Sequence, residues 1–131
     1  MLRKLIVTAL VGLAGCAAEP PPRPAPAPVE AIQAAQLSGH LNALQSLVQG
    51  SPAEQAETMA AARVAYDQAR QGPAALRYAL LLGAPRHPAR DALLAQRLLR
   101  EVLARPELIS PVERALAMVE LARVDDELGL A

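Results

Sequence analysis

Apolar residues after the first thirty positions recur at helical spacing, and glycines and prolines separate the apolar runs. Four apolar side chains share one stripe of a first predicted helix, with spacings of i, i+4, i+7 and i+11; they are Leu37, Leu41, Leu44 and Val48. Gly50 follows this stripe and can end the helix, because glycine adopts the backbone conformations found after a last helical turn.

A second helix is predicted from Ser51-Pro52-Ala53-Glu54. This sequence is typical of a capping box, with serine as N-cap, proline at the first helical position and glutamate at the third. The side expected to face the core carries Met59, Ala62, Tyr66 and Ala69. Gly72-Pro73 ends the helix.

A third, short helix is expected from about Pro73, and Leu76 to Leu82 is apolar nearly all round. A helix that is apolar on every side is a buried one, so we expect this element to be the most buried of the chain. Gly83-Ala84-Pro85 breaks it.

Two more helices complete the pattern. The fourth is expected to start near Pro88 and to end before Pro106, with an inward side formed by Leu94, Leu98, Leu99 and Val102. Ser110-Pro111-Val112-Glu113 repeats the capping box and opens the fifth. One side of this fifth helix carries Val112, Ala115, Leu116, Val119 and Ala122.

Composition supports the helical interpretation, because Ala and Leu dominate and the chain has no Phe and no Trp. The short connections predict antiparallel neighbours. The predicted fold class is therefore all-α, with about five antiparallel helices in helical-hairpin, tetratricopeptide-like packing. This helical interaction domain covers residues 30–131 and follows a signal peptide and a proline-rich linker.

The first fifteen residues have the layout of a signal peptide. Arg3 and Lys4 precede an apolar run that is too short to span a bilayer as a helix. The run ends in Leu13-Ala14-Gly15-Cys16, which matches the lipobox of bacterial lipoproteins. Leu13, Ala14 and Gly15 are the predicted signal-peptidase recognition residues, and Cys16 is the predicted lipidation site. The alternative is a chance cysteine after an ordinary signal sequence.

A linker over residues 16–29 follows the predicted cleavage site. Six prolines stand among the twelve residues Ala17–Pro28, which excludes helix and sheet there and favours an extended spacer of roughly 35–40 Å. Ala17 rather than aspartate follows the cysteine. In the lipoproteins that this sequence resembles, that choice indicates the outer membrane, with the protein facing the periplasm.

Few residues suggest chemistry. His40 and His87 are far apart in sequence and lack metal-ligand spacing, and the only thiol is assigned to lipidation. We interpret His87 as a cap or a solvent-facing residue. The acidic run Asp125-Asp126-Glu127 lacks the pattern of a calcium loop. We therefore predict no catalytic residue, metal, cofactor or small-molecule substrate, and the net charge of zero argues against nucleic acid as a partner.

Arginines are concentrated in one segment. Residues 77–105 hold six arginines and two acidic residues, whereas residues 106–131 hold two arginines and six acidic residues. The candidate partner-binding residues are Arg77, Arg86, Arg90, Arg97 and Arg100. Two interpretations stay open: the opposite charges pair neighbouring helices within the chain, or the arginines dock an anionic partner surface or lipid phosphate.

The segment from Ala62 to Leu121 resembles a known family. It reads ARVAYDQARQGPAALRYALLLGAPRHPARDALLAQRLLREVLA and continues to LISPVERALAMVELARV. This segment and the lipobox are similar to the proteobacterial outer-membrane lipoproteins of the QseG (YfhG) type. The resemblance implies an accessory lipoprotein that contacts the periplasmic part of a sensor histidine kinase of a two-component system, and it carries over no catalytic residue.

The predicted function is that of a non-enzymatic, membrane-anchored periplasmic lipoprotein that acts as a protein-interaction module, with an envelope protein as its partner. The alternative is a structural envelope factor that binds peptidoglycan or lipopolysaccharide through the arginine-rich segment.

Overall fold

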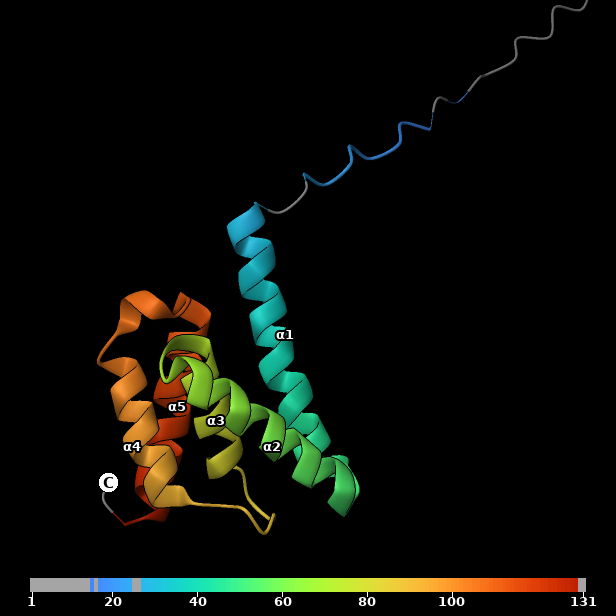
Figure 1. Ribbon diagram of the computed structural model, residues 1–131. Helices are drawn as coiled ribbons and strands as arrows, with labels where there is room; N and C mark the ends of the chain where they lie inside the picture. The colour runs from blue at the N-terminus through green and yellow to red at the C-terminus, as the bar shows by residue number, and fades with distance from the viewer. Residues whose placement is uncertain (1–14, 16, 25–26, 130–131) are drawn as a thin grey trace, which may run out of the picture.

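Five α-helices and one short 3₁₀ helix are present in the computed structural model, which describes residues 15, 17–24 and 27–129 (Figure 1). In chain order they are α1 (Pro28–Gln49), α2 (Pro52–Ala69), α3 (Gly72–Gly83), α4 (Ala92–Leu103), η1 (Pro106–Leu108) and α5 (Pro111–Glu127). The described residues contain no strand. The predicted all-α class is confirmed.

Each helix packs against the next one along the chain, and α3 also packs against α1 and α5. Figure 1 shows α3 at the centre of this arrangement, with α1 and α2 on one side of it and α4 and α5 on the other. Side chains on all sides of α3 are buried, among them Leu76, Leu80 and Leu81. The prediction that the third helix is the most buried element is confirmed.

Both predicted capping boxes are formed. The Ser51 N–H donates to Glu54 Oε2 at 2.6 Å, and the Glu54 N–H donates to Ser51 Oγ at 3.3 Å. The Ser110 box has the same two bonds, at 2.9 and 3.1 Å. Glu54 is exposed, whereas Glu113 is fully buried, so the same four-residue pattern starts one surface helix and one helix anchored in the interior.

The predicted stripe on the first helix is only partly correct. Leu37 and Leu44 are half-buried, but Leu41 and Val48 are exposed, and the fully covered side chains are those of His40 and Leu47. The covered side of α1 therefore follows residues 37, 40, 44 and 47 instead of residues 37, 41, 44 and 48. Gly50 follows the last turn as predicted, and its N–H donates to the Ser46 carbonyl.

The predicted side of the second helix is largely correct. Met59 and Ala62 are buried, and the half-buried Tyr66 ring stacks on the Tyr78 ring of α3 at a centroid distance of 5.2 Å. Ala69, at the end of the helix, is exposed.

The fourth helix begins later than predicted. Its N-cap is Asp91, whose carboxylate accepts from the Leu94 N–H at 2.9 Å, so the helix starts at Ala92 and not near Pro88. Pro88 lies in a turn, because a capping side chain outweighs the preference of proline for a first helical turn. The predicted inward side is correct: Leu98, Leu99 and Val102 are buried, and Leu94 is half-buried.

The predicted apolar side of the fifth helix exists but faces outward. Val112, Ala115, Val119 and Ala122 are exposed, and only Leu116 is half-buried. The buried side chains of α5 lie on its opposite side, and they are Glu113, Ala117 and Val124.

Residues 17–24 and 27 of the predicted linker have neither helix nor strand and are exposed, whereas its last two residues, Pro28 and Val29, already belong to α1, so the prediction that helix is excluded up to Pro28 is wrong at that end. In Figure 1 this exposed part of the linker runs away from the helices at the start of α1. The predicted interaction domain begins at residue 30, two residues after the first residue of α1.

Candidate protein-interaction site

The residues of the predicted lipobox lie almost wholly outside the described part of the chain. Leu13, Ala14 and Cys16 are outside it, and Gly15 is exposed, with open space around the position of a Cβ. Lipidation of Cys16 therefore stays a prediction from sequence.

Three of the five candidate arginines are engaged within the chain. Arg77 of α3 is half-buried, and its Nε donates to His40 Nδ1 at 3.3 Å. Arg90 pairs with Glu127, and Arg100 pairs with Asp125 at 3.3 Å, so both contact the acidic end of α5. For Arg90 and Arg100 the charge segregation is thus internal: it joins the basic region around α4 to α5.

The other two candidates, Arg86 and Arg97, are exposed and take part in none of the ion pairs found among the described residues. Arg86 sits in the turn before α4 with a φ of 66°. The predicted arginine face is therefore reduced to two residues.

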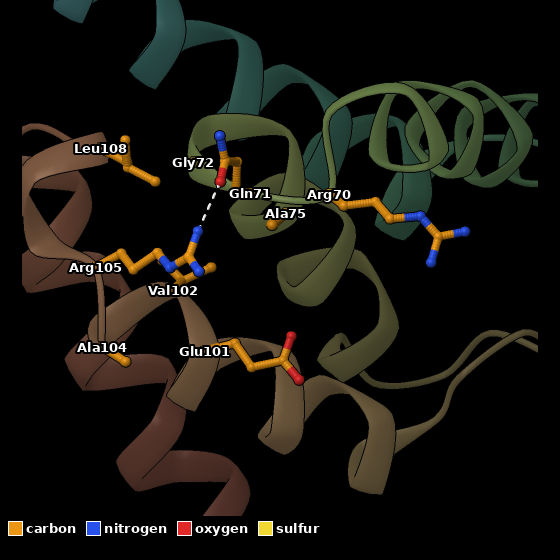
Figure 2. Close-up of a pocket in the computed structure, with 9 residues that line it drawn as sticks. All are labelled: Arg70, Gln71, Gly72, Ala75, Glu101, Val102, Ala104, Arg105 and Leu108. Atoms are coloured by element: carbon orange, nitrogen blue, oxygen red, sulfur yellow. Dashed lines mark hydrogen bonds between the residues drawn. The ribbon is translucent and has the colours of Figure 1, made fainter.

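A cavity of about 270 Å³ lies between the start of α3, the end of α4 and η1 (Figure 2). Ala75, Val102 and Leu108 give it apolar walls, and its charged residues are Arg70, Glu101 and Arg105. Figure 2 shows the Arg105 side chain turned toward Gln71, to which Arg105 Nη1 donates at 2.9 Å, whereas Arg70 extends away from them. The lining of this cavity therefore combines positively and negatively charged side chains with an apolar wall.

Gly72 forms the edge of this cavity where α2 ends and α3 begins. Its φ of 61° lies in the left-handed region, and a Cβ there would stand 3.3 Å from the Leu108 carbonyl oxygen. Two features therefore require glycine at residue 72: the left-handed turn and the close approach of η1.

A groove of about 240 Å³ lies between the first turns of α1 and the segment around η1. Val29 and Ile32 line it from α1, although 63% and 59% of their surfaces stay exposed, and Leu108 and Ile109 line it from the other side. The polar residues of its lining are Gln33, Gln36, Glu107 and Ser110. The groove therefore combines uncovered apolar side chains with one acidic residue, Glu107.

A buried polar network fixes α1 against α5 beside this groove. His40 Nε2 lies 2.7 Å from Glu113 Oε1, and both side chains are fully buried. Because the Arg77 N–H occupies His40 Nδ1, this nitrogen is the acceptor of a neutral imidazole, and Nε2 is the nitrogen that donates to Glu113. One oxygen of the Glu113 carboxylate thus accepts from His40 of α1, and the other accepts from the Ser110 N–H at the start of α5.

Burial lowers the pKa of His40, because the charged imidazolium loses its hydration. The hydrogen bond to Glu113 acts in the opposite direction, and the nearby positive charge of Arg77 lowers the pKa further. Gly39 leaves room for this arginine, since a Cβ at residue 39 would collide with the Arg77 guanidinium group.

Sequence reasoning missed the role of His40. The signal was present, because residues 37, 40, 44 and 47 follow the helical spacing of one covered side. Glu113 was identified as a capping residue, but a capping box alone does not show that its glutamate is buried.

His87 is not solvent-facing, and the helix end that it caps is the end of α3 rather than the start of the fourth helix. His87 is buried in the turn after α3, where its Nε2 lies 2.8 Å from the Leu81 carbonyl oxygen. The imidazole thereby satisfies a carbonyl near the end of α3.

Two charged groups have pKa values shifted by hydrogen bonds near helix ends. The Ser51 backbone N–H lowers the pKa of Glu54 by stabilising its carboxylate. The hydrogen bond to Glu120 raises the pKa of Arg123, whose Nη2 also donates to the Gly83 carbonyl. Arg123 thus ties α5 to the end of α3.

Within the described residues, no group of three or more His, Cys, Asp or Glu side chains is placed to hold a metal ion. None of the helices in the same part of the chain has both the length and the apolar character required to cross a membrane. Comparisons of the chain with protein-family models, curated proteins and solved structures return no match.

Proposed function

We propose that this chain is a lipid-anchored envelope protein whose helical body docks another envelope protein in the groove between α1 and η1. The observation that carries this proposal is the uncovered apolar surface of the first turns of α1. Val29 and Ile32 stay more than half exposed although they stand beside a formed groove. Apolar side chains gathered at a concave surface are typical of protein-binding sites.

The lining of the groove indicates the chemistry of the partner. Glu107 is the charged residue of the groove's lining, so the groove carries negative charge at that point. The complementary partner presents an apolar helix edge or segment flanked by Arg or Lys. The periplasmic domain of a sensor histidine kinase is the first partner to test, because the central segment resembles accessory lipoproteins of that system.

The position of the groove agrees with a tethered function. The linker ends at the first turn of α1, so the groove would be held within the reach of that linker from a lipid on Cys16. A membrane anchor confines both partners to one plane and raises their effective concentration.

The docking surface is tested by photo-crosslinking of the full-length protein in intact cells, with a photoreactive residue at position 32 or at position 48. Both positions lie on α1 and are exposed to a similar degree, but only residue 32 lines the groove. We expect a specific adduct with an envelope protein from position 32 alone. Equal adducts from both positions, or none from position 32, would contradict the proposal.

A matched pair of substitutions gives a second test of the same surface. Val29 and Val48 stand at opposite ends of α1 and are each 63% exposed. Val29→Asp should reduce the yield of the position-32 adduct at least tenfold, whereas Val48→Asp should leave it unchanged. A loss with both variants would show that the groove has no special role.

The anchor is tested separately by Cys16→Ala in the full-length chain. We expect loss of acyl-chain labelling and release from the membrane fraction, because one missing anchor removes the buried CH₂ groups that hold the protein. Unchanged labelling and fractionation would overturn the lipoprotein assignment.

A further inference from the structure

Arg77 of α3 is oriented by a buried chain of hydrogen bonds, yet it belongs to no ion pair among the described residues. Its Nε donates to His40 Nδ1 at 3.3 Å, and His40 Nε2 lies 2.7 Å from the carboxylate of Glu113. The side chains of His40 and Glu113 are fully buried. The interior therefore fixes the inner edge of the Arg77 guanidinium group.

The two terminal nitrogens of Arg77 are not used in this chain of hydrogen bonds. Within the described part of the molecule, only Nε of this side chain donates a hydrogen bond. Nη1 and Nη2 are not among the buried polar atoms left without a partner, so both reach solvent. The guanidinium group lies against Gly39 of α1, where a Cβ would collide with Nη2. Arg77 is thus a positioned cation with an open outer edge.

Arg77 lines a cavity of about 360 Å³ between α1 and α2. Residues 39, 42, 43 and 46 follow the helical spacing of one side of α1, so the guanidinium group lies on the side of α1 that lines the cavity. The volume falls within the range of small-molecule sites, roughly 300–1,000 Å³. The other lining residues are Asn42, Ala43, Ser46, Glu57, Thr58, Ala61, Ala62 and Ala65.

The lining indicates the chemical class of the ligand. The outer edge of a guanidinium group presents two parallel N–H groups, which match the two oxygens of a carboxylate. Glu57 places one negative charge in the same lining and therefore disfavours an anion with two charges, such as a phosphate dianion. The alanines of α2 offer a surface for a short apolar chain. A small monocarboxylate satisfies all three conditions.

We propose that the cavity between α1 and α2 binds a small monocarboxylate, whose oxygens accept hydrogen bonds from Nη1 and Nη2 of Arg77. His40 and Glu113 are positioning residues, because they hold the guanidinium group from behind without touching the ligand. The site is separate from the groove of the proposed function, which uses residues 29–36 of α1.

Butyrate is the probe, because it joins one carboxylate to a short apolar chain. It is titrated into the isotopically labelled full-length protein in detergent micelles at pH 7 and constant ionic strength, and binding is followed by NMR. Butyrate should shift the Gly39 amide signal and the Arg77 Nε–H signal until both saturate. Butyramide, which has the same shape without the charge, should shift neither signal.

The His40 imidazole gives a second signature in the same titration. The positive charge of Arg77 lowers the pKa of His40, and the charged side chains that act on this pKa are Arg77 and Glu113. A bound carboxylate neutralises the Arg77 charge, so butyrate should raise the pKa of His40. An unchanged His40 pKa at saturating butyrate would contradict binding at Arg77.

Gly39→Ala displaces the guanidinium group without removing it. The new Cβ meets the flexible end of the Arg77 side chain, and alanine favours the helix more than glycine does. Gly39→Ala should therefore keep the circular dichroism of the folded protein and bind butyrate at least tenfold more weakly. Arg77→Gln should show the same loss, whereas Arg97→Gln, which changes an exposed arginine outside the cavity, should bind like the unsubstituted protein.

Equal shifts with butyrate and butyramide would overturn the proposal, and so would unchanged butyrate affinity in a folded Gly39→Ala variant. An equal loss in Arg97→Gln would show a general effect of charge and would also overturn it. The outcome is independent of the groove: butyrate can bind whether or not position 32 yields an adduct, and the adduct does not require the cavity between α1 and α2.

Discussion

α3 and α5 are both apolar on more than one side, yet the chain covers them differently. α3 is surrounded by the helices before and after it, and its leucines are buried in every direction. α5 is the last described helix, and its outer face, formed by Val112, Ala115, Met118, Val119 and Ala122, is open to solvent. An apolar pattern therefore predicts that a helix face becomes covered, but it does not show whether the same chain covers it.

The largest expected effect lies in α3. Leu81 is fully buried, and Leu81→Ala should lower the free energy of unfolding by about 2–5 kcal/mol, because it removes apolar contacts and leaves a cavity. Urea unfolding followed by circular dichroism measures the change. The control is Val119→Ala on the outer face of α5, for which we expect a change within about 0.5 kcal/mol. Similar losses for both variants would mean that the outer face belongs to the core.

The next effect concerns the inner side of α5. Glu113→Ala should cost roughly 1–3 kcal/mol, because it leaves the buried His40 Nε2–H and the Ser110 N–H without their acceptor. Glu54→Ala in the other capping box is the matched control and should cost less, since Glu54 is exposed to water. A larger loss from Glu54→Ala would contradict the role given to the buried network.

A dependence on pH follows from the lowered pKa of His40. Above the ordinary histidine pKa, His40 is neutral in both the folded and the unfolded chain, and it adds no pH dependence. As the pH falls through that value, the unfolded chain binds a proton that the folded chain does not, so stability decreases. The urea concentration at the midpoint of unfolding should decrease as the pH is lowered from 7 to 5. His40→Gln should make this midpoint depend less on pH. An unchanged pH dependence in His40→Gln would assign the effect to other groups.

The smallest effect is expected from the ion pairs that join the basic region to α5. Arg100→Ala should cost less than about 1 kcal/mol, because Arg100 is more than half exposed and water screens its pair with Asp125. Arg97→Ala, which breaks no ion pair found in the structure, should have no effect on unfolding. Equal losses for both variants would show that the pairing of Arg100 with Asp125 is not what stabilises α5.

Much of the fold follows from local sequence signals. The two Ser-Pro-x-Glu capping boxes, Gly50 and the apolar run of α3 each act within a few residues, and the structure contains all of them. The start predicted for the fourth helix, near Pro88, is too early because both Pro88 and Asp91 favour a helix start, and in the structure the aspartate is the N-cap. Competition between neighbouring residues that can each start a helix thus decides where the helix begins.

The candidate sites were less predictable because they depend on distant parts of the chain. The groove joins residues 29–36 to residues 107–110, and the contact of His40 with Glu113 spans 73 positions. No local pattern specifies such contacts. The same reason explains the outer face of α5: its spacing identified the side correctly, but which side meets α3 and α4 is set by packing.

The groove between α1 and η1 is the proposed docking surface, and the photo-crosslink at position 32 tests it most directly. The yield of the position-32 adduct is measured in intact cells for the full-length protein and for its Val29→Asp and Val48→Asp variants. Val29 and Val48 are each 63% exposed, but only Val29 lines the groove. We expect a specific adduct that Val29→Asp reduces at least tenfold and that Val48→Asp leaves unchanged. No adduct, or an equal loss with both variants, would contradict the proposed docking surface.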